Sequence, residues 1–172
     1  MGLKKHFIYS KYNMSKSIYP KDFPLSKNLP KDCDFAVQKS DNKGIGIKAK
    51  RSFAKGEILC EIQGQLSSTM TLHSLQIDAE RHLHDPWFSG LLLHSCSPNT
   101  LVFMPSLRII AQENIQSGDW LTMDYATTEA ILYRQFKCHC GASNCRRWIT
   151  GYNEISFYKE SEFNENIPHD KQ

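Results

Sequence analysis

The chain has 172 residues and a mass of 19.8 kDa, which limits it to one domain of ordinary size with short extensions and excludes a large catalytic assembly. Its composition, 40% hydrophobic and 23% charged, supplies a core and excludes a disordered or collagen-like protein. The net charge of +3 conceals a gradient: residues 1–55 carry 13 Lys and Arg against 4 acids, residues 56–153 carry 6 against 9, and residues 154–172 carry 2 against 5. The basic character therefore belongs to the N-terminal part.

The sequence has no membrane or secretion signal. It contains no run of 18 apolar residues, and MGLKKHFIYSKY at the N-terminus lacks the apolar stretch of a secretory signal peptide. We therefore expect no membrane span and an intracellular location, in the cytoplasm or, for a secreted effector, in a host nucleus. Nothing in the sequence predicts an oligomeric state.

Residues 1–33 form a predicted basic N-terminal arm. Pro20, Pro24 and Pro30 break any long helix there, so we expect an irregular arm or a wrapping segment that contributes nothing to the core. One interpretation of its charge is a solvated arm, and the other is contact with nucleic acid, an acidic partner or an acidic membrane surface. At the other end, residues 154–172 form a predicted acidic C-terminal tail.

Short strands separated by turns dominate the predicted structure from residue 34 onward. The strand segments alternate apolar and polar residues and are separated by turns rich in Gly, Asn and Asp. Residues 67–90 are ambiguous between a short strand at 73–77 and a surface excursion, and residues 127–136 favour a short helix capped by Thr127 or Thr128. The predicted strands lie within residues 34–40, 46–53, 58–64, 101–115 and 120–125. We therefore predict a mainly β protein with short helices.

Six cysteines in a chain without a secretion signal indicate reduced thiols and a metal site rather than a disulfide framework. Three of them, Cys138, Cys140 and Cys145, lie in CHCGASNC, a C-x-C-x4-C spacing whose Gly-containing loop lets three thiolates converge. Zinc prefers about four such ligands in a tetrahedron. The candidates for the fourth are Cys33, Cys60, Cys96 and His139, of which His139 is poorly placed between two ligands.

Four motifs, in order over residues 34–153, resemble those of the SET-domain protein lysine methyltransferases. GIG at 44–46, followed by KGE at 55–57, resembles the family's G-x-G opening and I-x-x-G-E turn. The other three motifs are HSCSPN at 94–99, which resembles N-H-S-C-x-P-N, AQENIQSGDWLTMDY at 111–125, which resembles A-x-x-x-I-x-x-G-E-E-L-T-x-D-Y, and CHCGASNCR at 138–146, which resembles the post-SET C-x-C-G-x3-C-R-G. The chain is most similar to the compact bacterial members, with a short insert and a tail that ends near Gly151.

The resemblance implies a fold, a cofactor and a metal. Residues 34–134 would form a SET fold, with small curved sheets and a knot-like threaded C-terminal segment, and residues 135–153 a post-SET zinc-binding segment. The implied methyl donor is S-adenosylmethionine, the implied acceptor is a lysine of a protein or peptide, and the implied Zn2+ is structural. In post-SET proteins the fourth zinc ligand is the cysteine of H-S-C, here Cys96, which leaves Cys33 and Cys60 as ordinary buried or partly buried thiols.

The resemblance also assigns roles to single residues. Tyr125 is the implied catalytic residue, whose hydroxyl orients the lysine amine next to the methyl group; the alternative is a tyrosine that merely ends a core strand. The implied cofactor-binding residues are Gly44, Ile45, Gly46, Leu93, His94 and Trp148. For the glycines the alternative is a plain hairpin turn, and for Trp148 it is packing of the tail onto the core.

Four positions depart from the family's pattern. Leu93 replaces the Asn of N-H-S-C, Ile62 replaces the aromatic residue of Y-x-G that forms one wall of the lysine channel, and Arg147 replaces the Gly of C-R-G. The fourth is His73, aligned with a Tyr that relatives carry near the amino acid end of the cofactor. These departures keep an alternative function open, namely a catalytically impaired, zinc-stapled module that binds a peptide or protein. A third class, a zinc-ribbon nucleic-acid binder, leaves the motifs at 94–99 and 119–125 unexplained.

Overall fold

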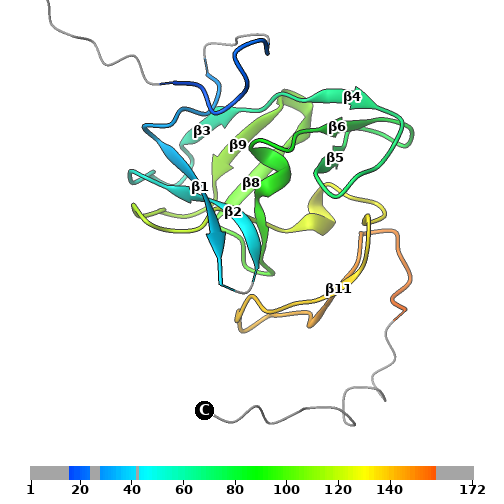
Figure 1. Ribbon diagram of the computed structural model, residues 1–172. Helices are drawn as coiled ribbons and strands as arrows, with labels where there is room; N and C mark the ends of the chain where they lie inside the picture. The colour runs from blue at the N-terminus through cyan, green and yellow to red at the C-terminus, as the bar shows by residue number, and fades with distance from the viewer. Residues whose placement is uncertain (1–15, 24–27, 42, 158–172) are drawn as a thin grey trace, which may run out of the picture.

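The computed structural model of the protein describes residues 16–23, 28–41 and 43–157 (Figure 1). Much of the predicted basic arm and most of the predicted acidic tail lie outside the described residues. The strands are β1 (Phe35–Ser40), β2 (Gly44–Ala49), β3 (Ile58–Glu61), β4 (Gln65–Ser67), β5 (Ser74–Gln76), β6 (His82–His84), β7 (Leu93–His94), β8 (Thr100–Phe103), β9 (Arg108–Ala111), β10 (Thr122–Met123), β11 (Phe136–Lys137) and β12 (Trp148–Ile149), and the 3₁₀ turns are η1 (Ser89–Leu91), η2 (Met104–Ser106) and η3 (Tyr125–Thr127). The prediction of a mainly β protein with short helices is confirmed. No helix in the described part of the chain is long and apolar enough to cross a membrane.

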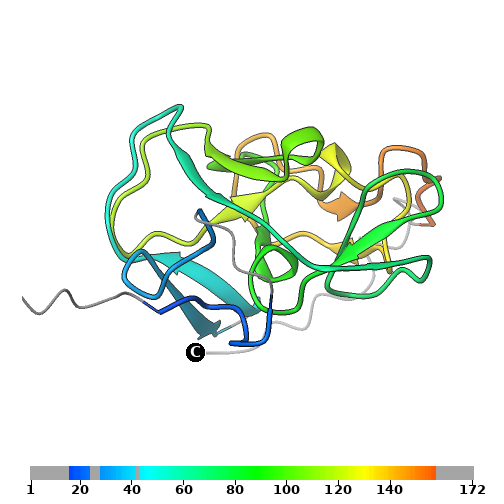
Figure 2. The ribbon, with the colours of Figure 1, turned by 90° about the horizontal axis from the view of Figure 1, so that it is seen from above.

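The strands pair into several small sheets. β1 pairs with β2, β3–β9–β8 and β4–β6–β5 form three-stranded antiparallel sheets, and β11 pairs with β12. The segment at 73–77, ambiguous in the sequence, contains the strand β5. Seen from above, the β1–β2 hairpin (cyan) and the C-terminal segment with β11 and β12 (orange) lie on either side of the green central segments (Figure 2).

The first strand of the β1–β2 hairpin agrees with the strand predicted within residues 34–40, whereas β2 begins two residues before the strand predicted at 46–53 and ends at Ala49. Its register runs from Phe35 opposite Ala49 to Ser40 opposite Gly44. Gly44 closes the turn at a φ of +83°, a backbone conformation that glycine adopts without a steric cost. One face of the hairpin is buried because Phe35, Ile47 and Ala49 all point into the core.

The main core lies between this hairpin and the β3–β9–β8 sheet. The ring of Phe35 stacks on that of Phe53 with centroids 5.4 Å apart, and Phe88 meets Phe35 edge-on at 5.0 Å. Ile109 of β9 and Ile115 are fully buried in the same cluster. Aromatic pairs in these geometries stabilise a core beyond the apolar area that they bury.

The N-terminal segment contributes to this core, contrary to our expectation. Tyr19 and Leu29 are only 3% and 5% exposed and belong to the main hydrophobic cluster. The prolines do prevent regular structure, but the segment pairs with itself, since the N–H of Ile18 donates to the carbonyl of Pro30 at 3.1 Å. An irregular segment whose backbone groups are paired can bury its apolar side chains without a penalty for unsatisfied polar groups.

The short helix predicted over residues 127–136 is also wrong. The chain makes a single 3₁₀ turn, η3, whose N-cap is Asp124 rather than a threonine: its side chain accepts the N–H of Ala126. After η3 the backbone groups hydrogen-bond to other segments instead of to a helix. The carbonyl of Glu129 accepts the N–H of Tyr152, and the N–H of Ala130 donates to the side chain of Gln76. These partners are distant in sequence, so helical periodicity did not reveal them.

Candidate functional site

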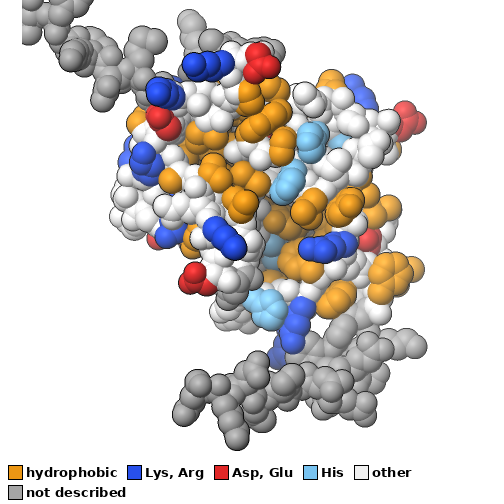
Figure 3. All heavy atoms as spheres, viewed as in Figure 1, with side chains coloured by type: hydrophobic (Ala, Val, Ile, Leu, Met, Phe, Trp, Pro, Cys, Tyr) orange, Lys and Arg blue, Asp and Glu red, His pale blue; other side chains and the backbone are white. Residues whose placement is uncertain are grey.

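A cavity of about 470 Å³ opens between the hairpin, the β4–β6–β5 sheet and the C-terminal segment. Figure 3 shows apolar and histidine side chains gathered in the middle of this face, with lysine and arginine side chains beside them. The described residues that line it are Lys43, Gly44, Met70, Thr71, Leu72, Ser74, Leu75, Ser89, Gly90, Leu92, Leu93, His94, Met123, Tyr125, Glu129, Leu132, Tyr133, Arg134, Phe136, Lys137, Cys138, His139 and Cys140. An apolar cavity with a few converging polar groups is the usual form of a small-molecule site.

Parallel pairing of β7 with β10 builds the inner wall of this cavity. Leu93 lies opposite Thr122 and His94 opposite Met123, so two segments about 30 residues apart run side by side. The N–H of Ser95 donates to the carbonyl of Met123 at 3.0 Å and extends the pairing. The pairing therefore places the H-S-C motif directly beside the residues that lead into Tyr125.

Tyr125 stands at the end of this wall with its hydroxyl held in place. Its O–H donates to the carbonyl of Leu92 at 2.8 Å, and its ring meets those of His94 and Phe136 with centroids 5.1 Å and 5.9 Å away. Burial, together with the nearby charge of Glu129, raises the pKa of Tyr125 to about 12. The phenol is therefore neutral at physiological pH, its proton directed at Leu92 and its lone pairs available to an incoming donor.

His94 connects Tyr125 to a cluster of thiols. Burial lowers the pKa of His94 to about 4 although Asp124 nearby opposes the shift, so the imidazole is neutral at pH 7. Its Nδ1 accepts the backbone N–H of Tyr125 at 3.4 Å, which assigns its proton to Nε2. That nitrogen lies 3.5 Å from the sulfur of Cys96, so the ring bridges the tyrosine and the thiol.

Cys96, Cys138, Cys140 and Cys145 form a cluster in which all four sulfur atoms lie within 4.8 Å of one another. The sulfurs of Cys96 and Cys138 are 3.9 Å apart. A tetrahedral zinc with Zn–S bonds of ~2.3 Å places its ligands ~3.8 Å apart, so these four positions suit that geometry. Backbone N–H groups at 3.3 Å from Cys96 and 3.4 Å from Cys145 favour the thiolate form that a metal requires.

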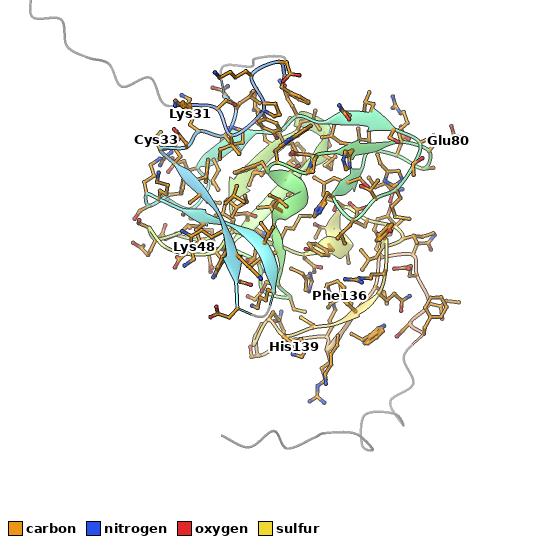
Figure 4. All side chains as sticks on the ribbon, viewed as in Figure 1. Lys31, Cys33, Lys48, Glu80, Phe136 and His139 are labelled. Carbon is orange, nitrogen blue, oxygen red and sulfur yellow. The ribbon has the colours of Figure 1, made fainter. Side chains whose placement is uncertain are left out.

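The other candidates for the fourth ligand are not in the cluster. Cys33 is exposed, not buried as expected, and lies far from His139 in Figure 4. Cys60 is buried in the main core, where burial raises the pKa of its thiol. His139 is exposed at the cavity edge, near Phe136 on the same C-terminal segment (Figure 4).

An ion pair joins the thiol loop to the residue before Tyr125. Both terminal nitrogens of Arg146 donate to the carboxylate of Asp124, at 2.6 Å and 2.5 Å. These hydrogen bonds lower the pKa of Asp124 even though its burial acts in the opposite direction. A bidentate arginine–carboxylate pair fixes both distance and orientation, so it fixes the position of the cysteine-containing loop relative to η3.

The structure brings only some of the predicted cofactor-binding residues to the cavity. Gly44, Leu93 and His94 line it, whereas Ile45 is exposed on the hairpin outside it. Gly46 lies behind the wall: a Cβ at this position would come within 2.8 Å of the Cγ of Leu93.

Trp148 and Ile62 also lie away from the cavity wall. Trp148 belongs to β12, where its indole N–H donates to the side chain of Gln135 at 2.9 Å, which agrees with packing of the tail. Ile62 is 1% exposed in the main core and does not line the cavity.

Sequence reasoning missed Glu129 and the turn at Ser89 and Gly90, all of which line the cavity. Glu129 is only 6% exposed, and its Oε1 accepts the N–H of Gln76 at 2.9 Å. Burial raises the pKa of its carboxyl group. The sequence carried no signal for it, since an acid in the first turn of the helix expected over residues 127–136 is typical of a solvated position.

Comparison with known proteins agrees with this arrangement. A family model described as "SET domain" matches residues 44–126. The "Variant-silencing SET domain-containing protein" of Plasmodium falciparum is 25% identical over 153 residues, covering 73% of this chain and 6% of the relative. The "Histone-lysine N-methyltransferase, H3 lysine-36 specific" of Saccharomyces cerevisiae is 29% identical over 140 residues, covering 67% of this chain and 19% of the relative. The chain thus spans less than a fifth of the length of these curated relatives.

Solved structures share the fold. The crystal structure of KRYPTONITE in complex with mCHG DNA and SAH has a TM-score of 0.56 and 26% identity, over 66% of this chain and 28% of that one. The methyltransferase domain of human histone-lysine N-methyltransferase SETMAR has a TM-score of 0.56 and 21% identity, over 68% of this chain and 58% of that one. The expected fold class is confirmed by these two structures.

Proposed function

Residues 44–126 of this chain are a SET domain, and on that premise we propose that the protein transfers a methyl group from S-adenosylmethionine to a lysine side chain of a protein. The observation that carries the proposal is the position of Tyr125, whose hydroxyl is fixed at the wall of an apolar cavity to which all four of the motifs contribute residues. Relatives named histone-lysine methyltransferases support the same reaction class.

The residues of the cavity suit an in-line transfer. The reaction forms a bond between the lysine nitrogen and the methyl carbon, breaks the sulfur–carbon bond of the donor, and requires the amine to arrive without its proton. The apolar wall favours the neutral amine over the ammonium ion. Because the proton of Tyr125 is donated to Leu92, its oxygen lone pairs accept an N–H of the amine and orient the nitrogen.

We assign the cofactor to the same cavity. Gly44, Leu93 and His94 line the cavity wall, which supports them as proposed cofactor-binding residues. Ile45, Gly46 and Trp148 lie off the wall, and only the resemblance of their motifs supports the same proposal for them. Lys43, Arg134 and Lys137 at the cavity are cationic and suit the carboxylate of the bound donor. S-adenosylmethionine would supply the electrophilic methyl group.

We also propose that Cys96, Cys138, Cys140 and Cys145 hold a structural Zn2+. Four thiols at tetrahedral spacing, with N–H groups directed at two of the sulfurs, support this donor set. The ion would fix the C-terminal segment, whose residues Phe136 to Cys140 form one side of the cavity.

The test compares methyl transfer by matched tyrosine variants. The native chain, incubated with labelled S-adenosylmethionine and a mixed protein extract, is expected to label protein. Tyr125→Phe is expected to lose about a hundredfold or more of the rate, because the amine is no longer oriented. Tyr152→Phe, which alters a tyrosine 66% exposed, is expected to behave as the native chain.

Two results would contradict the proposal. Equal labelling by the native chain and Tyr125→Phe would remove the tyrosine from its role. No labelling by the native chain, together with no heat of binding when S-adenosylmethionine is titrated in, would favour the impaired binding module.

A further inference from the structure

The side chain of Tyr19 ties the N-terminal segment to Asp85, four residues before the cavity-lining Ser89. Its ring is packed between Phe23, stacked at 5.4 Å, and Trp87, tilted at 5.9 Å. Its hydroxyl lies 2.7 Å from a carboxylate oxygen of Asp85 and accepts the N–H of Gln63 at 3.2 Å. Tyr19 precedes the stretch matched by the SET family, which begins at residue 44.

The carboxylate of Asp85, which accepts the hydrogen bond from the Tyr19 hydroxyl, is fully buried. The residue is 0% exposed, and a buried carboxylate needs a full set of donors. Apart from Tyr19, its oxygens accept the N–H groups of Trp87, Phe88 and Ser89 at 3.1, 3.1 and 2.8 Å, and the hydroxyl of Ser89 at 2.5 Å. Four of its five donors thus belong to the segment immediately after it.

That segment enters η1 at Ser89, and η1 leads directly to Leu92, the hydrogen-bond partner of Tyr125. Ser89 and Gly90 line the cavity, and the N–H of Leu92 donates back to the carbonyl of Ser89 at 3.2 Å. The carbonyl of Leu92 in turn accepts the hydroxyl of Tyr125. A continuous hydrogen-bonded path therefore runs from Tyr19 through Asp85 and η1 to the proposed catalytic hydroxyl.

The turn η1 depends on the Asp85 carboxylate because η1 has few hydrogen bonds within itself. A three-residue 3₁₀ turn has poor hydrogen-bond geometry, and the residue at its N-cap, Phe88, makes no side-chain cap. Gly90 is confined as well, since a Cβ there would come within 2.4 Å of the carbonyl oxygen of Asp85 and 2.5 Å of that of His73. The peptide that carries the Leu92 carbonyl thus has two anchors: η1, which Asp85 holds, and the N–H of Leu93, which donates to the carbonyl of Leu121 at 3.3 Å.

We propose that Tyr19 and Asp85 are positioning residues for methyl transfer. Tyr19 of the N-terminal segment orients the Asp85 carboxylate, and this carboxylate fixes the start of η1 through its bonds to Ser89. The position of η1 in turn affects the Leu92 carbonyl, which accepts and so orients the hydroxyl of Tyr125. The inference rests on the proposed function. Displacement of a reacting group by about 1 Å costs about a hundredfold in rate, so a small shift of η1 is felt at the amine.

The experiment uses Tyr19→Phe, which keeps the aromatic packing and removes only the hydroxyl. We expect the initial rate of transfer from saturating labelled S-adenosylmethionine into a mixed protein extract to fall about ten- to a hundredfold, while the KM for the donor changes less than about twofold. We also expect the 13Cζ NMR resonance of Tyr125 to shift as its hydrogen bond to Leu92 changes. Tyr152→Phe is the matched control and should move neither.

The outcomes separate positioning from stability. A folded Tyr19→Phe with a lower melting temperature but the native rate and an unmoved Tyr125 resonance would overturn the inference. Should Tyr19→Phe fail to fold, Ser89→Ala, which removes one hydrogen bond to Asp85, takes its place under the same criteria. If the native chain transfers no methyl group, the proposed function is contradicted. The 13Cζ resonance of Tyr125 in Tyr19→Phe would then decide alone whether Tyr19 affects the Tyr125 hydroxyl.

Discussion

Glu129 is buried where the cavity wall meets β5, and its carboxylate accepts a backbone N–H from Gln76. Burial raises the pKa of this group, so its charged form is disfavoured in the folded chain. When the pKa of a carboxyl group is higher in the folded than in the unfolded state, the group does not lower the free energy of unfolding at a pH below its pKa in the unfolded state. It lowers that free energy as the pH rises through its pKa in the folded state. The native charge at Glu129 is therefore a pH-dependent cost to stability.

Glu129→Gln removes that cost and retains the side-chain oxygen that accepts the N–H of Gln76. We expect the variant to be more stable than the native chain at pH 9, and the difference to shrink as the pH falls to 5. Thermal unfolding followed by circular dichroism across this range measures it, with the exposed Glu80→Gln as control. A difference between Glu129→Gln and the native chain that stays constant with pH would contradict the assignment.

Arg147 adopts a φ of 65°, in the left-handed region that side chains with a Cβ avoid. This conformation explains the Gly that the SET family carries after C-R, and it costs about 1–2 kcal/mol in a non-glycine residue. Since glycine also loses more chain entropy on folding, we expect Arg147→Gly to stabilise the protein by about 0.5–1 kcal/mol. Arg147→Ala keeps the Cβ and should show no such gain in urea unfolding; an equal gain would mean that the arginine side chain, not the backbone, carries the strain.

At the scale of the elements, β2 and β7 approach so closely that Gly46 leaves no room for a Cβ beside Leu93. Gly46→Ala is expected to lower the free energy of unfolding by about 1–3 kcal/mol through overpacking. In the background of Leu93→Ala the same change should cost less, because the side chain it strikes is gone. A double-mutant cycle by urea denaturation measures the coupling, and additive costs would show that the two residues do not meet.

The elements also show how far local pattern reaches. The β1–β2 hairpin follows from a Gly turn and alternating apolar residues, both of which are visible within a dozen positions. The helix expected after Tyr125 failed because Glu129 and Ala130 hydrogen-bond to Gln76 and Tyr152 instead. Periodicity detects contacts between near neighbours and is blind to partners 20 or more residues away.

At the scale of the whole molecule, the thiol cluster joins Cys96 to residues 42 positions later, so a bound metal would tie two distant segments together. Metal binding of this kind contributes directly to folding because the unfolded chain has no preformed site. We expect one Zn2+ per chain by elemental analysis. Chelation should then lower the melting temperature by several degrees and open residues 136–149 to hydrogen exchange.

Cysteine variants provide the control for this prediction. Cys96→Ser is expected to lose the metal and to reproduce the effect of the chelator, whereas Cys33→Ser, at an exposed position outside the cluster, should keep both metal and stability. Full zinc content in Cys96→Ser would contradict the proposed ligand set.

The N-terminal segment shows what a count of charges conceals. Its lysines suggested a separate arm, yet Tyr19 and Leu29 lie in the core and Tyr19 hydrogen-bonds to Asp85, which is 66 residues away. The predicted boundary at residue 33 therefore follows the change in composition, while packing continues across it.

The sequence by itself determined the class of fold, the hairpin, the three-cysteine spacing and, through its motifs within residues 44–126, the family. Each of these depends on residues that are near one another along the chain. The tertiary structure places Cys96, which the resemblance had implied, beside the other three thiols. Only the tertiary structure decided that Glu129 and η1 line the cavity and that Tyr19 reaches Asp85. These are contacts between segments tens of residues apart. They depend on the path of the whole backbone, and the pairing of β7 with β10 sets that path at the site.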